Sequence, residues 1–228
     1  MKRHIGLLIA AVAVLAGSRL VWAGEILDRI VATVNGHLIL QSDWDDALRY
    51  QALVDGRALD QFLPAERKAA LDRLIDQELL REQMGTSDLK HAGDEEIARR
   101  IQEIRGRYPD AARDEQWRDV LSGYGFTQEE LKRQVLLQLD LMRLVDVRLR
   151  PTVTIDSASI ESYYNKELLP QLRQSGKGEV PLAEATPQIK ELLTQQKMNQ
   201  LLVAWLQNLR SGSEIQTQPG AESQGESR

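Results

Sequence analysis

The chain contains no cysteine among its 228 residues, and this absence excludes several kinds of chemistry. A disulfide framework, a thiol nucleophile, a metal site with thiolate ligands and a lipid-modified N-terminal cysteine all require that residue. The folded chain must therefore be stabilised by packing alone, without covalent cross-links.

Histidine is almost as scarce, with only His4, His37 and His91. The three lie in unrelated contexts, so they do not form the spacing of a metal site. The sequence also lacks the GxSxG, HExxH and phosphate-binding glycine motifs of common hydrolases and nucleotide-binding proteins. Its carboxylates gather at predicted helix N-termini, as in Asp94–Glu96, where capping and the helix dipole account for them. We therefore predict no catalytic residue, no metal site, no cofactor and no use of ATP.

The first 23 residues have the pattern of a secretory signal. A basic stretch at 2–4 precedes an apolar run from Ile5 to Gly17, which is too short to span a bilayer of ~30 Å comfortably. Val21 and Ala23 place small or aliphatic residues at the positions that a signal peptidase reads. We predict cleavage after Ala23 and export of the mature chain.

An uncleaved membrane anchor is the alternative for this segment, and Arg19 disfavours it because it interrupts the apolar run. Cleavage would remove Lys2, Arg3 and Arg19 and no acid, so the formal charge would change from −5 to −8. An acidic mature protein is a poor candidate for general nucleic-acid binding.

A tight β-hairpin is predicted near the start of the mature chain. Ile30 to Val34 shows the period-2 pattern of a strand, and His37 to Leu40 is a second short apolar strand. Asn35-Gly36 between them favours the positive φ values of a type I′ turn. Ser42 follows as the predicted cap of a helix, with Asp45 in the capping-box position. Two strands alone are marginally stable in water, so the hairpin needs a third strand or a helical layer.

Apolar residues at helical spacing predict that most of the remaining chain is helical. The predicted helices cover 42–55, 64–85, a region from 94, a region around 117–121, 127–149, a region from 156, and about 187–210. Glu214 to Thr217 can form one short strand, which we expect to pair with the hairpin. The predicted fold class is mostly α, with a small antiparallel sheet formed by the N-terminal hairpin and a short C-terminal strand. Several residues on helical stripes are expected in the core: Trp44, Trp117, Trp205, Met84, Met142 and Met198.

Four segments occur in an informative order along the chain: DRIVATVNGHLILQSDWDDAL, LDRLIDQELLREQMG, GFTQEELKRQVLLQLDLMRL and ATPQIKELLTQQKMNQLLVAWLQNLRSGSEI. In that order they resemble the chaperone module of SurA-type periplasmic proteins, from its opening hairpin and helix to its closing helix and strand. The resemblance covers most of residues 25–217. The shared order carries more weight than any single amphipathic segment.

Members of this family usually carry one or two parvulin-type prolyl isomerase domains before the closing helix. Here about a dozen residues separate Leu172 from Pro187, whereas a domain of ordinary size needs upward of ~50 residues. The resemblance therefore implies a chaperone core without the isomerase. The expected organisation is a signal peptide at 1–23, an N-terminal chaperone domain at 24–155, a helical linker at 156–180 in place of the parvulin module, a closing helix and strand at 181–217 that pack back on the N-terminal domain, and a disordered tail at 218–228.

The resemblance implies an ATP-independent periplasmic holding chaperone rather than an enzyme. Its partners would be unfolded polypeptides such as outer-membrane β-barrel precursors, with no stable membrane insertion after signal cleavage. Tyr108, Tyr124 and Phe126 lie in segments marked by Gly and Pro, and we expect them to form the client-contact surface. Two alternatives are a family protein with residual prolyl isomerase activity and a secreted subunit that docks on one folded partner.

Overall fold

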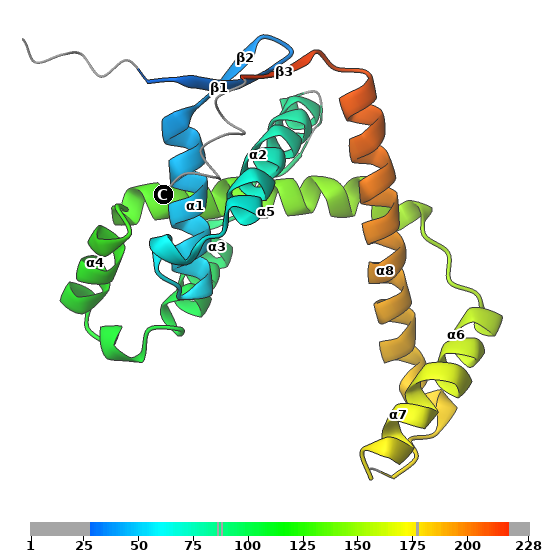
Figure 1. Cartoon of the computed structure of the whole chain (residues 1–228). Coiled ribbons are helices and arrows are strands. Elements are labelled where there is room, and N and C mark those ends of the chain that lie inside the picture. The colour runs from blue at the N-terminus through cyan, green and yellow to red at the C-terminus, as the bar shows by residue number, and fades with distance from the viewer. Residues whose placement is uncertain (1–27, 86, 88, 177, 219–228) are drawn as a thin grey trace, which may run out of the picture.

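The computed structural model describes residues 28–85, 87, 89–176 and 178–218. It is mostly helical and carries one three-stranded antiparallel sheet, which confirms the predicted fold class (Figure 1). The predicted signal sequence, and the predicted tail apart from Gln218, lie outside the described residues. Within the part of the chain that is described, no helix is both long and apolar enough to cross a membrane.

The opening hairpin forms as the sequence predicts. Strands β1 (Ile30–Val34) and β2 (His37–Leu40) pair antiparallel across Asn35 and Gly36. Both turn residues have positive φ, at 48° and 84°, which is the geometry that a type I′ turn requires. Strand β3 (Ile215–Thr217) pairs antiparallel with the other side of β1, so the strand order is β2-β1-β3. The predicted pairing of the two chain ends is thus confirmed, and β2 and β3 are the edges of the sheet.

Helix α1 (Gln41–Asp55) follows β2 without a linker, and the predicted cap at Ser42 is wrong. The N-cap is Leu40, whose backbone N–H donates a 2.8 Å hydrogen bond to the carboxylate of Asp43. Ser42 lies in the first helical turn, where its backbone N–H and its hydroxyl donate to Asp28. The helix starts earlier than predicted because the last residue of β2 also serves as its cap.

Helix α2 (Pro64–Gly85) packs with α1 beneath the sheet, and the short 3₁₀ turn η1 (Leu59–Gln61) joins the two helices. Pro64 stands at the helix start, where its missing N–H removes no intrahelical hydrogen bond. The sheet, α1 and α2 share the first hydrophobic core, which contains Val31, Ala32, Val34, Ile39, Trp44, Leu48, Ala52, Phe62, Ala70, Leu71, Ile75 and Leu79.

Helix α5 (Gln128–Leu149) is the long central helix, and α2, α3 (Asp94–Arg105) and α8 (Leu182–Ser211) all contact it. The predicted capping box at its start is confirmed. The Glu130 backbone N–H donates to the Thr127 hydroxyl at 3.2 Å, and the Thr127 backbone N–H donates to the Glu130 carboxylate at 2.8 Å. These bonds satisfy donors that the first helical turn leaves without intrahelical partners.

A first arm consists of α3, the 3₁₀ turn η2 (Pro109–Ala111) and α4 (Asp114–Gly123). It packs on the ends of α1 and α5 through a second hydrophobic core, which contains Tyr50, Leu53, Ala92, Ile97, Ile104, Ala111, Trp117, Leu121, Phe126, Leu131 and Val135. The arm is therefore joined to the body by apolar contacts from both helices.

A second arm begins at the 3₁₀ turn η3 (Arg150–Thr152). It contains α6 (Ser157–Tyr163), the π-helical turn η4 (Tyr164–Leu168) and α7 (Leu169–Gln174), which together with the first half of α8 form a helical unit. A separate small core of Ile160, Ala185 and Ile189 holds this unit together.

Helix α8 begins at Leu182, so the predicted start near Pro187 is wrong. A proline inside a helix removes one backbone hydrogen bond and costs ~3 kcal/mol or more. Here Ala185 and Ile189, on either side of the proline, are buried against α6, and this packing offsets the cost.

The second half of α8 returns to the body and carries the chain to β3. Trp205, Leu206 and Leu209 pack near Leu80, Leu141 and Leu144. Arg210 Nε donates a 2.6 Å hydrogen bond to Asp76 of α2. Of the residues expected in the core, Met142 is 55% exposed, and that expectation is wrong because Leu141 and Leu144 fill the buried side of this turn. The remaining expected core residues are buried or partly buried: Trp44, Trp117, Trp205, Met84 and Met198.

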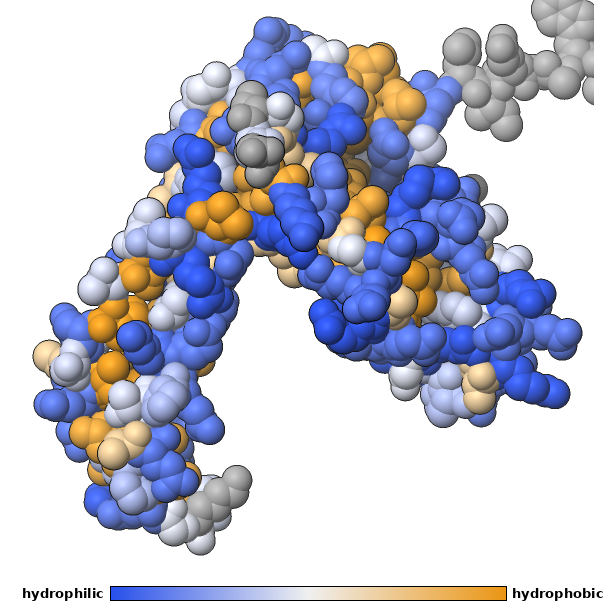
Figure 2. Space-filling view, turned by 180° about the vertical axis from the view of Figure 1, so that it is seen from behind, coloured by the Kyte–Doolittle hydropathy of each residue, from blue (hydrophilic) through white to orange (hydrophobic). Residues whose placement is uncertain are grey.

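The two arms point away from the central body in diverging directions (Figure 1). Figure 2 shows the open concave space between them and apolar side chains along the arm built from α6, α7 and α8. The described chain therefore has an open, two-armed shape around a compact centre.

Candidate functional site

A groove runs between α1, α2 and α5 and begins beside strand β2. It consists of two adjoining cavities of about 220 and 380 Å³. Ala47, Leu74, Gln77 and Gln134 line both cavities, so the two form one continuous depression. Two of its walls come from the consecutive helices α1 and α2, and the third comes from α5, which is distant in the sequence.

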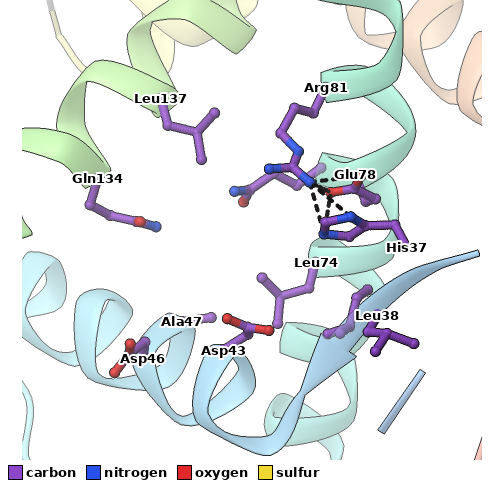
Figure 3. A pocket seen from close by; sticks show the side chains of 12 residues that line it. His37, Leu38, Asp43, Asp46, Ala47, Leu74, Glu78, Arg81, Gln134 and Leu137 are labelled. Atoms are coloured by element: carbon purple, nitrogen blue, oxygen red, sulfur yellow. Dashed lines mark hydrogen bonds and ion pairs between the residues drawn. The ribbon is translucent and has the colours of Figure 1, made fainter. Parts of the chain in front are cut away.

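The end of the groove beside β2 contains a charged cluster (Figure 3). Arg81 donates a 2.9 Å hydrogen bond to the Glu78 carboxylate, and a guanidinium nitrogen of Arg81 lies 2.8 Å from Nε2 of His37. The same His37 nitrogen is 3.6 Å from Glu78. The side chain of Glu78 is only 11% exposed, and the guanidinium of Arg81 balances the charge of its carboxylate.

The other charged groups of the groove are also engaged. Asp46 accepts a hydrogen bond from Arg49, and Asp43 accepts the N–H bond that caps α1. Arg73 donates to the amide oxygen of Gln51. A ligand would therefore meet charges that already have partners, so the groove shows no strong preference for one sign of charge.

The middle of the groove is lined by side-chain amides above an apolar floor. Gln77 comes from α2, and Gln134 and Gln138 come from α5, while Ala47 and Leu74 supply apolar surface. Figure 3 shows Gln134 pointing into the space between the helices. Within the described residues, none of these three amides makes a hydrogen bond, so their donors and acceptors are available to a bound molecule.

Tyr50 lines the end of the groove that is remote from β2. The residue is 6% exposed, and its hydroxyl is a buried polar group without a hydrogen-bond partner in the described part of the chain. Burial raises the pKa of this hydroxyl above its ordinary value, and the charge of Arg100 opposes the rise. The hydroxyl therefore keeps its proton at neutral pH and can act as a donor.

The three aromatic residues predicted as the client-contact surface lie together, on the first arm. The rings of Tyr108 and Tyr124 are 6.2 Å apart, and the Tyr108 ring is 5.9 Å from Trp117. The Tyr108 hydroxyl donates to the carbonyl of Leu53 at 2.6 Å, and burial raises its pKa. These contacts belong to the second core.

The other two predicted residues are held in the same way. The Tyr124 hydroxyl donates to the carbonyl of Arg57 at 3.1 Å, and Phe126 is only 9% exposed and packs edge-on against Tyr50. The geometry of all three residues favours a structural role, because they join the loops of the first arm to α1. Replacing them together would remove part of a core as well as any contact surface.

Asp140 is a buried carboxylate that the sequence analysis did not single out. It is 3% exposed and accepts hydrogen bonds from the Ala92 backbone N–H at 2.8 Å and from Nδ1 of His91 at 2.7 Å. It therefore anchors the loop that leads into α3. The described residues contain no group of three or more His, Asp or Glu side chains arranged to hold a metal ion.

The glutamines of the groove were also missed by the sequence analysis. Gln134 and Gln138 are four residues apart on α5, as are Arg73 and Gln77 on α2, so each pair lies on one helix face. That spacing was the available signal. It indicates a polar stripe beside each apolar stripe, but not that the two stripes face each other.

Comparison with known families gives one match. The family model described as the SurA-like N-terminal domain matches residues 1–144. The matched stretch includes β1, β2, α1, α2 and most of α5, and therefore every residue that lines the groove. No parvulin domain family is detected in the chain. No curated protein sequence matches it.

Proposed function

Because this chain belongs to the SurA-like N-terminal domain family, we propose that it is an ATP-independent periplasmic holding chaperone. Its clients are unfolded envelope proteins, including precursors of outer-membrane β-barrels. The observation that carries the proposal is the family match itself, which spans β1, β2, α1, α2, most of α5 and the groove. The proposal rests on membership of this family, because a shared fold alone does not imply a shared function.

The open shape supports this function. An unfolded client exposes alternating apolar and polar residues over long stretches, and a two-armed molecule offers a wide surface to such a chain. Large apolar side chains are exposed on α5 and α8: Met142, Val147, Leu192 and Val203. Separate apolar contacts of this kind favour weak and reversible binding, because each buries little surface.

An aggregation assay tests the proposal directly. A urea-denatured β-barrel precursor is diluted into buffer without ATP, and light scattering is followed with and without the mature protein. We expect the protein to delay scattering in a concentration-dependent way. An inert protein of similar size and acidity serves as the control. If the mature protein delays scattering no more than this control, it is not a holding chaperone for such clients.

The two alternatives predict different results. A subunit with one folded partner should recover a single protein from an envelope extract, whereas a holding chaperone should recover many unfolded ones. A prolyl isomerase should accelerate proline-limited refolding, which otherwise takes tens to hundreds of seconds. We expect many captured proteins and no acceleration.

The proposed location depends on the N-terminal signal. Export and cleavage after Ala23 would give a mature chain that starts at Gly24. Intact-mass measurement of the protein from a periplasmic fraction shows directly whether residues 1–23 have been removed. A mass that retains residues 1–23 would contradict both the cleavage and the soluble periplasmic location.

A further inference from the structure

We propose that the groove between α1, α2 and α5 binds an extended client segment by its main chain, through the amides of Gln77, Gln134 and Gln138. The inference rests on the proposed function and adds the contact residues and the part of the client that they recognise. The occupant is a segment of an unfolded polypeptide, held as a strand that runs from β2 toward Tyr50.

The amides are chemically suited to a peptide backbone. A glutamine side chain carries both a carbonyl acceptor and N–H donors, the same groups as a peptide bond. It can therefore pair with a peptide group whatever the client side chain is. Three such amides from two helices line this groove without partners among the described residues. This arrangement favours recognition that does not depend on the client sequence.

The charges of the groove favour a neutral occupant. Glu78 is paired with Arg81, and Asp46 is paired with Arg49. A nucleic acid or an acidic ligand would need free cationic groups, whereas here Arg81 binds a carboxylate and Arg73 donates to the amide oxygen of Gln51. The uncharged polar groups and the apolar floor at Ala47 and Leu74 remain as the main contact surface.

Strand β2 adds a main-chain edge at the entrance. It is an edge of the sheet, and Val34 and His37 form the pair next to the two-residue turn. In such a hairpin that pair is hydrogen-bonded and the next pair, Thr33 with Leu38, is not. The backbone N–H and carbonyl of Leu38 therefore point away from β1, where an extended segment could pair with them. His37, Leu38 and Ile39 all line the groove.

The dimensions fit a short strand. The groove follows α1 from Asp43 to Val54 and α2 from Ala70 to Arg81. Each of these spans has a length of ~16 Å at 1.5 Å per helical residue. An extended chain rises ~3.3 Å per residue, so the groove holds about five client residues. Tyr50 lies at its far end and contributes to the lining there.

A peptide-binding experiment tests main-chain recognition. The probe is a fluorescein-labelled, end-capped ten-residue peptide of alternating valine and threonine, and binding is followed by fluorescence anisotropy. A second probe has the same residues in scrambled order, and a third is N-methylated at alternate positions, which removes backbone donors. We expect the first two to bind alike and the third to bind about tenfold more weakly, equivalent to losing one or two hydrogen bonds.

The protein variant is Gln77→Met, Gln134→Met and Gln138→Met combined, because methionine keeps the length and helix propensity of glutamine without the amide. A matched control carries Gln102→Met, Gln128→Met and Gln171→Met at exposed positions of α3, α5 and α7 outside the groove. We expect the groove variant to bind the unmodified peptides about tenfold more weakly and to discriminate less against the N-methylated one. The control should bind like the wild type, and circular dichroism melts should show all three proteins folded.

The outcomes separate this inference from the proposed function. If the wild type delays client aggregation but neither N-methylation nor the groove variant weakens peptide binding, main-chain recognition in the groove is wrong and the chaperone function stands. If the peptide results are as expected but aggregation is not delayed, the groove binds peptides and the holding function is wrong. If the protein forms a dimer that the peptide does not dissociate and the peptide does not bind, the occupant is a second copy, which also contradicts the inference.

Discussion

Asn35 connects the N-terminal hairpin to the C-terminal segment of the chain. Replacing it by glycine tests how much this connection stabilises the fold. Its side-chain oxygen accepts a 2.9 Å hydrogen bond from the Glu214 backbone N–H. Its amide nitrogen donates to the Ser213 hydroxyl at 3.2 Å and to the Glu82 carboxylate at 2.8 Å. Glycine tolerates the positive φ of this position, so Asn35→Gly removes the three side-chain bonds while the turn can still form.

The expected loss of stability follows from these bonds. A neutral hydrogen bond contributes about 0.5–1.5 kcal/mol and one to a charged group about 1.5–3 kcal/mol. Asn35 is exposed, so water replaces part of each interaction, and the total effect should be about 2 kcal/mol. For a chain of this size, that corresponds to a fall in melting temperature of about 4–8 °C.

Thermal melts followed by circular dichroism measure this fall, and a double-mutant cycle assigns it. The same substitution is made in a chain that ends at Gly212, which lacks the partner residues Ser213 and Glu214. In that shortened chain the substitution should lower the free energy of unfolding distinctly less, because only the hydrogen bond to Glu82 remains to be lost. An equal cost in both chains would show that Asn35 stabilises the hairpin alone and does not couple the chain ends.

Three further predictions concern other parts of the fold. Deleting the chain from Leu182 onward should abolish cooperative melting because it removes α8 and β3, whereas deleting only 219–228, which carries no large apolar residue, should leave the melting temperature unchanged. A hydrogen bond from Arg57 lowers the pKa of Glu66 from 4.5 to about 2. The Glu66 carboxylate therefore adds stability that is fully present above pH 4.5 and lost as the pH falls through 2. Glu66→Gln should consequently be less stable than the wild type in urea melts near neutral pH. If the difference in unfolding free energy between the two proteins did not shrink as the pH falls toward 2, the stabilising role of the Arg57–Glu66 ion pair would be contradicted. Asp140→Ala should cost about 1–3 kcal/mol in the same melts, because a buried backbone N–H loses its acceptor, and a change below about 0.5 kcal/mol would show that the loop needs no anchor.

Local chemistry explains which features the sequence predicted correctly. Asn35-Gly36 specifies a type I′ turn because these residues tolerate positive φ. Thr127 caps α5 and Asp156 caps α6 through side chains that reach only three residues along the chain. The fold class and the family resemblance follow from many such local signals in one order, and the family match agrees with them.

The wrong predictions involve residues whose roles depend on distant partners. The N-cap of α1 is Leu40 rather than the predicted Ser42, because β2 runs directly into the helix. Pro187 remained inside α8 because its neighbours pack against α6. The contact role of Tyr108 and Tyr124 stays a prediction, but local sequence did not indicate that their hydroxyls bind carbonyls of the α1 region, which are 55 and 67 positions away in the sequence.

The sequence by itself determined the hairpin, most helix positions, the pairing partner of the last strand and the family. The tertiary structure alone decided where the groove lies. Gln77 and Gln134 are separated by 57 residues, and each is an ordinary polar residue beside an apolar helix stripe. The packing of α2 and α5 around a common core turns both toward one space, next to the open edge of β2. Helical periodicity fixes which side chains share a face, whereas only packing fixes which faces meet.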